Sequence, residues 1–162
     1  MIAFTTPDLS DDFPDARHLP FQLRQFGQRS RFFGRASTVF CDADNSRVAE
    51  AVSEAGEGRV LLVDGQGHLH RSLLGDRLAQ LAADNAWAGV IVIGAIRDVE
   101  VIEQIDLGVQ ALGVCPIKTK KQGRGERDIP VTFSSVTVSP GDWLYADRNG
   151  VLVSTVALIN DE

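Results

Sequence analysis

Hydrophobic positions fall into short runs along the middle of the chain, separated by polar or glycine-rich stretches. Residues 59–63 and 88–96 are almost continuously apolar, which is typical of strands that are covered on both faces. Residues 36–42 are rich in β-forming residues, and residues 108–114 form a further mostly apolar run. Four strands are therefore expected in this part of the chain.

Helical patterns separate these strands. Residues 47–55 place apolar side chains three and four positions apart, with Asn45 or Ser46 as the cap. The clearest helix spans about residues 76–86 and carries a carboxylate in its first turn, where negative charge is favoured. A shorter helix is expected over residues 98–105. This alternation of strand and helix predicts an α/β protein.

The last third of the chain is mostly strand-like. Strands are expected there over residues 129–133, 135–138 and 150–156, in addition to a more alternating strand over residues 68–74 in the middle of the chain. Asn149-Gly150 is a hairpin signal between the strand residues Tyr145 and Val151. The whole pattern predicts two sheets with helices outside them.

Length and composition indicate one globular domain, residues 1–162, in which residues 1–20 form a polar N-terminal arm with a short helix near residues 9–13. Hydrophobic residues make up 44% and charged residues 23%, which are ordinary globular values. The apolar runs fall far short of the roughly 20 residues that cross a membrane. The N-terminus has no basic region followed by an apolar core, so we expect a cytoplasmic protein.

Charge and cysteine content narrow the choice of function. A net charge of −6 argues against a general nucleic-acid-binding protein, which needs excess Lys and Arg to displace counterions. Cys41 and Cys115 lie in no CxxC motif and near no His at metal-binding spacing. A disulfide between them is possible from the sequence, but two buried thiols in a reducing cytoplasm are favoured.

Asp76, Arg97 and Asp98 are the first candidates for a functional site. Asp76 begins a helix, and Arg97 and Asp98 follow the next strand. In a right-handed strand–helix–strand unit, helix starts and strand carboxyl ends share one edge of the sheet, where ligands of open α/β sheets bind. The 20 residues between Asp76 and Arg97 fit one helix and one strand, so the three side chains can converge.

The residue types indicate the chemistry of this edge. Backbone N–H groups of residues 75–78 can hold a carboxylate, and Gly75 lets a ligand approach the backbone closely. Arg97 offers a planar fork for a carboxylate or oxo group. Asp98 is a hard oxygen ligand for Mg²⁺ or Mn²⁺, and Asp76 could act as acid or base through a metal-bound water. The alternative is a helix cap at Asp76 and a surface Arg97–Asp98 ion pair.

Two weaker candidates follow the apolar run of residues 59–63. Residues 64–67 contain two glycines that could cradle a phosphate, but the full GxGxxG pattern is absent and a tight turn is favoured. His68 and His70 would share one face of a strand and could bind a metal. With no third His or Cys nearby in the sequence, an ordinary strand surface is favoured.

Two further segments are rich in cations. Residues 118–128 contain five basic and two acidic residues, which predicts a loop that is mobile or ordered by a ligand. The loop could bind an anionic substrate, an acidic protein surface or RNA, or be only a solvated loop. Phe32 and Phe33 could form a binding arm, although core or subunit packing is favoured. The arginines around this aromatic pair are Arg29, Arg31 and Arg35.

Four motifs together resemble the RraA-like family. They are GRVLLVDGQG at 58–67, LLGD at 73–76, GAIRD at 94–98 and GDWLYADRNG at 141–150. The resemblance extends over about residues 26–153. The family includes metal-dependent 4-hydroxy-4-methyl-2-oxoglutarate aldolases and bacterial regulators of ribonuclease E activity. Some members have been called demethylmenaquinone methyltransferases, but this chain has no S-adenosylmethionine glycine motif.

The resemblance implies a layered β/β/α fold of the swivelling-domain kind, in a ring-shaped homotrimer that sometimes pairs into a hexamer. The aldolases carry an Asp-x20-Arg-Asp signature, which Asp76, Arg97 and Asp98 reproduce. By that match, Asp98 binds the divalent metal, and Arg97 contacts the pyruvyl part of a 2-oxo acid. Asp76 positions the water that shuttles protons. The backbone that would hold the substrate carboxylate belongs to Gly75, Asp76, Arg77 and Leu78.

Two functions therefore remain open. The first is a metal-dependent aldolase that cleaves 4-hydroxy-4-methyl-2-oxoglutarate and also decarboxylates oxaloacetate. The second is a regulator whose acidic surface binds a basic region of a ribonuclease E-type protein. The longer aldolases of the family have an extra C-terminal segment with a further acidic residue, and this chain is closer in length to the regulators. The sequence thus predicts the pyruvate-binding half of a site but not the part that recognises the rest of a substrate.

Overall fold

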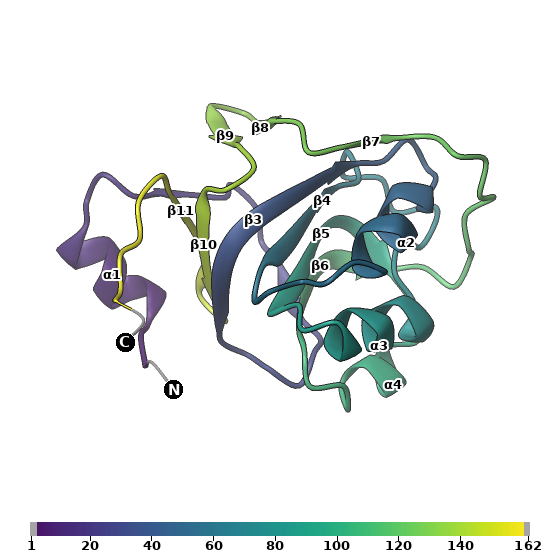
Figure 1. Ribbon diagram of the computed structural model, residues 1–162, viewed down its shortest axis with the longest axis horizontal. Coiled ribbons are helices and arrows are strands. Elements are labelled where there is room, and N and C mark those ends of the chain that lie inside the picture. Colours follow the sequence, from purple (N-terminus) through teal and green to yellow (C-terminus); the bar gives the residue numbers. More distant parts are fainter. Residues whose placement is uncertain (1–2, 161–162) are drawn as a thin grey trace.

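Three layers form the fold: one layer of helices and two of strands. The computed structural model describes residues 3–160 (Figure 1). The helices are α1 (Thr6–Asp12), α2 (Ser46–Val52), α3 (Asp76–Asp84) and α4 (Val99–Ile102). The strands are β1 (Arg17–His18), β2 (Arg24–Gln25), β3 (Phe32–Phe40), β4 (Val60–Asp64), β5 (Gly89–Ile96), β6 (Gly108–Val114), β7 (Glu126–Arg127), β8 (Val131–Phe133), β9 (Val136–Val138), β10 (Trp143–Asp147) and β11 (Gly150–Ser154). The expected α/β class is confirmed.

The main sheet joins a parallel half to an antiparallel half through β3. Strands β3, β4, β5 and β6 run parallel to one another, and β2 adds an antiparallel edge next to β6. On the other side, β10, β11 and β1 pair antiparallel. Residues 32–35 of β3 pair with β10, whereas residues 36–40 pair with β4. One strand therefore belongs to both halves.

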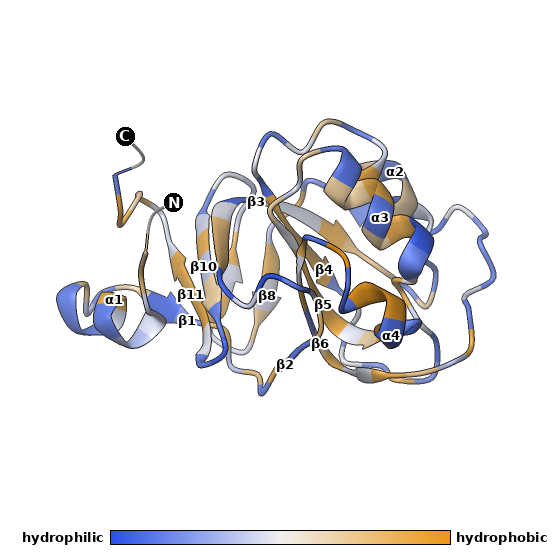
Figure 2. Ribbon diagram, turned by 90° about the horizontal axis from the view of Figure 1, so that it is seen from below, coloured by the Kyte–Doolittle hydropathy of each residue, from blue (hydrophilic) through white to orange (hydrophobic). Residues whose placement is uncertain are grey.

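Each face of the parallel half buries its own hydrophobic core. The face under α2 and α3 buries Leu61 and Val63 of β4, and the opposite face buries Val60 and Leu62. On that opposite face, side chains of β8, β9, β10 and β11 complete the core, so the order of layers is helix, sheet, sheet. Figure 2 shows the apolar residues gathered on the central strands and the polar ones on the loops. The continuous apolar runs in the sequence reflect this burial on both faces.

One large aromatic side chain fills the space beside two glycines of neighbouring strands. A Cβ added to Gly108 would lie 2.1 Å from Phe32 Cδ1, and one added to Gly89 would lie 2.4 Å from the same ring. A Cβ on Gly113, also in β6, would meet only the Leu69 side chain, at 3.6 Å. Gly108 is thus fixed by packing, and Gly113 is not.

We expect Gly108→Ala to lower the free energy of unfolding by about 1–3 kcal/mol, since it overpacks a rigid core. Gly113→Ala is the matched control in the same strand and should change stability by less than about 0.5 kcal/mol. Urea unfolding of the two variants measures both values. Equal losses for the two would contradict this packing argument.

Residues 68–74 are not the expected strand. They form an irregular segment beside the carboxyl end of β5, and only isolated parallel bridges join Ser72 to Ala95 and to Lys118. The Ser72 N–H donates to Ile117 O and the Leu73 N–H donates to Ala95 O, so the segment is held by single hydrogen bonds instead of a continuous ladder. The predicted strand was wrong because the alternating polarity of residues 68–74 comes from an irregular segment that lies between Ala95 on one side and residues 117–118 on the other.

The other expected elements occur with shifted ends. α3 ends at Asp84 because Ala86 turns the chain with a φ of +64°. α4 has four residues, fewer than expected. Asn45 is the N-cap of α2, but its side chain makes no capping bond, and Asp44 Oδ1 accepts from the Ser46 N–H instead. The Asn149-Gly150 hairpin is confirmed as the link between β10 and β11.

Both cysteines are buried free thiols, as favoured from the sequence. Burial raises the pKa of the Cys41 thiol to about 12, helped by the nearby Asp44 and Asp64 carboxylates. A thiol with such a pKa is protonated at neutral pH, so Cys41 belongs to the core and is a poor nucleophile.

The N-terminal arm packs against the end of the antiparallel half. Its helix starts at Thr6, earlier than expected, because the Thr5 hydroxyl caps it by accepting from the Asp8 N–H. Phe4 and Leu9 are buried against Tyr145 and other side chains of β10 and β11. Of the predicted arm, residues 1–2 lie outside the described residues.

Among residues 3–160, no helix is both long and apolar enough to cross a lipid bilayer.

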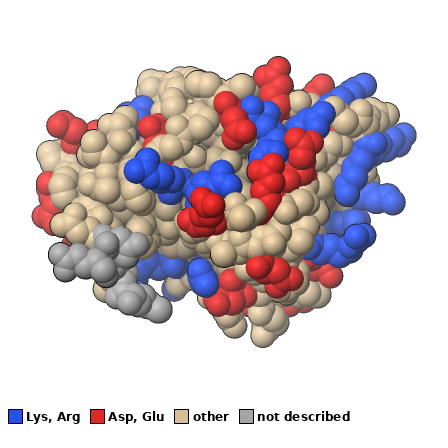
Figure 3. Space-filling model, in the orientation of Figure 1, with Lys and Arg blue, Asp and Glu red and all other residues tan. Residues whose placement is uncertain are grey.

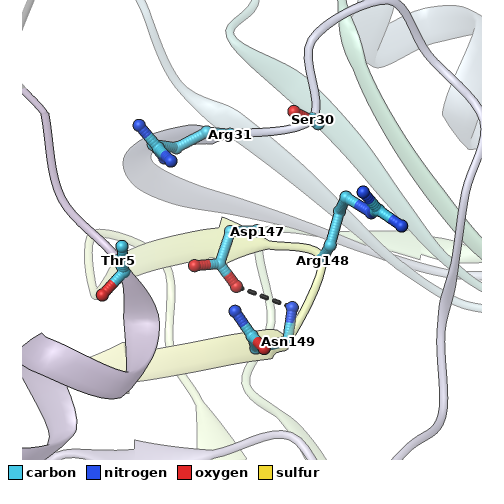
Figure 4. Close-up of a pocket in the computed structure, with 6 residues that line it drawn as sticks. All are labelled: Thr5, Ser30, Arg31, Asp147, Arg148 and Asn149. Carbon is cyan, nitrogen blue, oxygen red and sulfur yellow. Dashed lines mark hydrogen bonds between the residues drawn. The ribbon is translucent and has the colours of Figure 1, made fainter.

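A buried carboxylate holds this arm in place. Asp147 accepts from the Thr6 N–H and the Thr6 hydroxyl, each at 2.7 Å, and from the Asn149 N–H at 2.8 Å. Figure 4 shows Asp147 beside Asn149, with Arg31 at the rim of a hollow of about 400 Å³. Burial alone would raise the Asp147 pKa, but the hydrogen bonds from Thr6 and Asn149 outweigh it and leave the pKa below its ordinary value.

We expect Asp147→Asn to destabilise the protein by about 1–3 kcal/mol at pH 7, because charged hydrogen bonds are lost. A lowered pKa in the folded state stabilises above the unfolded pKa of roughly 3.9, and this contribution disappears as pH falls through the folded value. The difference between wild type and variant should therefore shrink between pH 7 and pH 3. Denaturant unfolding at both pH values tests this, and a constant difference would contradict it.

Candidate functional site

A cleft of about 1040 Å³ opens at the carboxyl edge of the parallel strands. Its walls come from the start of α3, the junction of β5 with α4, and the segment that follows β6. The lining residues that matter below are Asn45, Gly75, Asp76, Arg77, Leu78, Asp84, Arg97, Asp98, Lys118, Thr119, Lys120 and Lys121. All six residues predicted as a site from the sequence are among them. The topology places them at the edge where α/β proteins bind ligands.

The three residues of the Asp-x20-Arg-Asp signature meet in this cleft. The Asp76 backbone N–H donates to Asp98 Oδ2 at 3.2 Å, and Arg97 Nε lies 3.9 Å from the same oxygen. Arg97 Nη1 also donates to the Pro116 carbonyl at 3.4 Å. The side chains of Arg97 and Asp98 are 38% and 39% exposed, so both remain open to a ligand.

Gly75 is required for this close approach. An added Cβ would lie 2.8 Å from Asp98 Oδ2 and 3.6 Å from Arg97 Nε. The φ of Gly75 is −120°, which any residue can adopt, so space and not backbone freedom demands glycine here. From the sequence, Gly75 was expected to let a ligand approach the backbone closely. In the structure the group that approaches it is the Asp98 carboxylate.

Asp98 has an uncommon backbone conformation. Its φ and ψ are +60° and +39°, the left-handed region that only Gly, Asn and Asp visit readily. The turn ends β5 and begins α4 in one step, which directs the Asp98 carboxylate back toward the start of α3.

The first turn of α3 supplies backbone donors. Its N–H groups have no partner within the helix, because intrahelical bonding begins with the Ala79 N–H on Gly75 O. The Asp76 N–H is taken by Asp98, which leaves the N–H groups of Arg77 and Leu78 for an anion. The hypothesis of a carboxylate site over residues 75–78 is compatible with this geometry.

The donor set fits one kind of metal ion better than another. Within residues 3–160, no three His, Cys, Asp or Glu side chains are grouped so as to hold a metal. A closed zinc-type centre is therefore not built from the described part of this chain. A single exposed carboxylate such as Asp98 suits Mg²⁺ or Mn²⁺, which keep several waters and share ligands with the substrate.

Sequence reasoning did not place the lysines of the loop over residues 118–128 in this cleft. The loop is held by α2 and by the residues that precede this helix. Asp44 Oδ2 accepts from the Gln122 N–H at 2.6 Å, and Arg47 Nε donates to Gly125 O at 3.3 Å. Burial would raise the Asp44 pKa, but hydrogen bonds from Ser46, Gln122 and Arg124 outweigh it and hold the pKa below its ordinary value. The loop composition signalled an anion site, but only the fold shows which cleft it faces.

The weaker candidates lie elsewhere. His68 and His70 have ring centroids 5.3 Å apart, with no third metal ligand grouped with them in the described part of the chain. The Gln66 N–H donates to Asp64 Oδ1 at 2.9 Å, which forms the tight turn that was favoured. Burial raises the pKa of that Asp64 carboxyl.

Packing is also confirmed for the aromatic pair. Phe32 is buried in the core, and Phe33 stacks on Tyr145 with ring centroids 5.6 Å apart.

A cleft at the carboxyl edge of a parallel sheet, with a second strand layer behind the sheet, defines a layered α/β protein. Within this class, the family model described as RraA-like, Aldolase/RraA, matches residues 6–153. The chain therefore belongs to the RraA-like family.

Relatives at high identity carry an aldolase name. A protein of Ectopseudomonas mendocina (strain ymp), named "Putative 4-hydroxy-4-methyl-2-oxoglutarate aldolase", is 53% identical over 96% of both chains. A protein of Vibrio cholerae with the same name is 49% identical over 94% of this chain and 96% of its own.

Solved structures carry other titles. The structure titled as the RNA-processing inhibitor RraA from Thermus thermophilis is 42% identical, with a TM-score of 0.91 over 95% of this chain and 94% of its own. A Geobacillus kaustophilus structure titled as S-adenosylmethionine: 2-dimethylmenaquinone methyltransferase is 41% identical, with a TM-score of 0.94 over 98% of this chain and 99% of its own. Names within the family thus differ, while the fold is shared.

Proposed function

We propose that this protein is a divalent-metal-dependent aldolase that cleaves 4-hydroxy-4-methyl-2-oxoglutarate into two molecules of pyruvate. The observation that carries the proposal is the convergence of Asp98, Arg97 and the first turn of α3 on one cleft. The aldolase names of relatives at about 50% identity support the same reaction class.

The residues divide the work by chemistry. The N–H groups of Arg77 and Leu78 bind the C1 carboxylate of the substrate, and the Arg97 guanidinium faces its C2 oxo group. Asp98 would hold Mg²⁺ or Mn²⁺, which when bound supplies further electrophilic stabilisation of that oxo group. With the substrate fixed in this way, the C3–C4 bond is the one poised to break.

Cleavage then follows as a retro-aldol step. A water held by the Asp76 carboxylate takes the proton of the C4 hydroxyl, C4 becomes a ketone, and the electron pair of the C3–C4 bond forms the enolate of pyruvate. Arg97 stabilises the negative charge that develops on the C2 oxygen. Return of the proton to C3 gives the second pyruvate. Loss of CO₂ from oxaloacetate leaves the same enolate, so decarboxylation should accompany cleavage.

Pyruvate release tests the proposal directly. Purified protein with Mg²⁺ or Mn²⁺ should release pyruvate from 4-hydroxy-4-methyl-2-oxoglutarate and from oxaloacetate faster than the metal alone. Chelation with EDTA should remove the excess rate. A rate equal to that of the metal alone with both substrates would reject the aldolase function.

Regulation of RNA processing is the second candidate. It is favoured by the 42% identity to the structure titled as an RNA-processing inhibitor and by the net charge of −6, which suits a basic partner surface. A pull-down with a ribonuclease E-type protein at low salt tests it, and absence of binding there would count against this role.

We also propose that the chain forms a homotrimer, which can pair into a hexamer. Three exposed apolar side chains near the edge of the parallel sheet support an association surface, namely Leu69, Val114 and Ile117. Light scattering coupled to gel filtration measures the mass. A monomer at micromolar concentration would contradict the proposal.

A further inference from the structure

We propose that the segment of residues 118–121 receives the second carboxylate of the substrate, so that the site prefers 2-oxo diacids to 2-oxo monoacids. The inference deepens the proposed function, because it rests on the pyruvyl end of the substrate binding at Arg97 and the start of α3. It assigns the recognition group that the sequence alone did not reveal.

The charge of the cleft is opposite to that of the chain. Five cationic side chains line it, namely Arg77, Arg97, Lys118, Lys120 and Lys121, against three acidic ones, Asp76, Asp84 and Asp98. The chain as a whole carries −6. The loop between β6 and β7 forms one edge of the molecule in Figure 1, and Figure 3 shows Lys and Arg gathered at that edge. Positive potential is thus concentrated where an anionic substrate would enter.

The three lysines are free to bind. Within residues 3–160, no ion pair involves Lys118, Lys120 or Lys121, and all three are exposed. Other cations near the loop are already committed: Arg127 pairs with Glu50 and Glu54. An acidic substrate group is therefore the partner that the lysine side of the cleft still lacks.

Thr119 fixes the lysines beside the pyruvyl end. It is buried between exposed neighbours, and its hydroxyl donates to Asn45 Oδ1 at 2.8 Å while accepting from the Asn45 N–H at 3.3 Å. Asn45 Nδ2 in turn donates to Leu73 O at 3.3 Å, two residues before Gly75. On the other side, the Pro116 carbonyl accepts from Arg97. Residues 116–119 are therefore linked to Arg97 directly and to the approach to α3 through Asn45.

This arrangement distinguishes the two ends of a diacid. One carboxylate and its oxo group fit Arg97 and the N–H groups of α3, which form a fixed, directional set of donors. The other carboxylate meets flexible ammonium groups, which act as point charges and tolerate variation in chain length and branching. A monoacid such as pyruvate uses only the first set.

Binding of two probes tests the inference without catalysis. In the presence of Mg²⁺, calorimetry should show that wild type binds 2-oxoglutarate more tightly than pyruvate. The triple variant Lys118→Gln, Lys120→Gln, Lys121→Gln should weaken 2-oxoglutarate binding about tenfold or more, equivalent to ~1.4 kcal/mol. Pyruvate affinity should change by less than about twofold, as expected for a carboxylate that the lysines do not touch.

A control for the loss of a loop cation outside the cleft comes from the same loop. Arg124 does not line the cleft, so Arg124→Gln should leave both affinities unchanged. Thermal melting of the variants verifies that each is folded. Equal weakening of the two acids in the triple variant, or no preference of wild type for the diacid, would overturn the inference.

The results separate this inference from the aldolase proposal. If wild type cleaves no substrate but shows a lysine-dependent preference for 2-oxoglutarate, the aldolase function fails and the carboxylate site stands. If wild type cleaves its substrate and the triple variant binds both acids as wild type does, only the role of the lysines is rejected.

Discussion

Asp98→Asn is expected to lower the metal-dependent release of pyruvate about 10²–10³-fold, the loss typical for one strong electrostatic contribution at a reacting oxygen. The amide keeps the shape of the side chain but removes the negative charge that would attract a divalent ion. Asn also tolerates the left-handed backbone of residue 98, so the fold should survive. Asp98→Ala would add backbone strain to the loss of charge and is the less informative change.

The measurement combines catalysis with metal binding. Titration with Mn²⁺, followed by its paramagnetic resonance signal, should show weakened binding in Asp98→Asn. Asp84→Asn is a suitable control, because this substitution also removes one negative charge from the cleft, but at the far end of α3. Similar losses in both variants would mean that general cleft charge, and not the position of Asp98, determines activity.

Gly75→Ala is expected to lower activity about 10²-fold, the loss that a misplacement of ~1 Å produces, with only a small loss of stability. The backbone of Gly75 suits alanine, but the new methyl group would lie 2.8 Å from Asp98 Oδ2 and displace it. The hydrogen bond from the Asp76 N–H to that oxygen would be broken as well. Enzyme assay and urea unfolding of the variant separate the two effects.

A double-mutant cycle identifies the target of the methyl group. If Gly75→Ala acts through the Asp98 carboxylate, the double variant with Asp98→Asn should be no slower than Asp98→Asn alone. Additive losses would show instead that the methyl group blocks the substrate or disturbs the start of α3.

The convergence of Asp76, Arg97 and Asp98 could be predicted from the sequence, because it follows from the order of elements along the chain. Asp76 begins a helix, Arg97 follows the next parallel strand, and topology alone brings helix starts and strand ends to one edge. The lysines could not be placed in this way. Their position depends on contacts such as that of Asn45 with Thr119, which are 74 residues apart and follow no periodic rule.

The fold shows the same division. The apolar runs of β4 and β5 predicted buried strands correctly, since burial on both faces leaves an unmistakable pattern. Residues 68–74 were wrongly predicted as a strand, because their irregular backbone makes only a few hydrogen bonds to its neighbours, donated by the Ser72 and Leu73 N–H groups and accepted by the Leu74 carbonyl. The docking of the N-terminal arm depends on Thr6 meeting Asp147, 141 residues away, which no local pattern encodes.

β3 has a consequence for how the molecule unfolds. Residues 32–35 pair with the antiparallel half of the sheet, and residues 36–40 pair with the parallel half. Because one continuous strand belongs to both halves, one half cannot unfold without disturbing the strand that the other half needs. Loss of order in this strand would open both hydrophobic cores at once. The protein should therefore melt in a single cooperative transition, with the amides of β3 among the slowest to exchange with solvent.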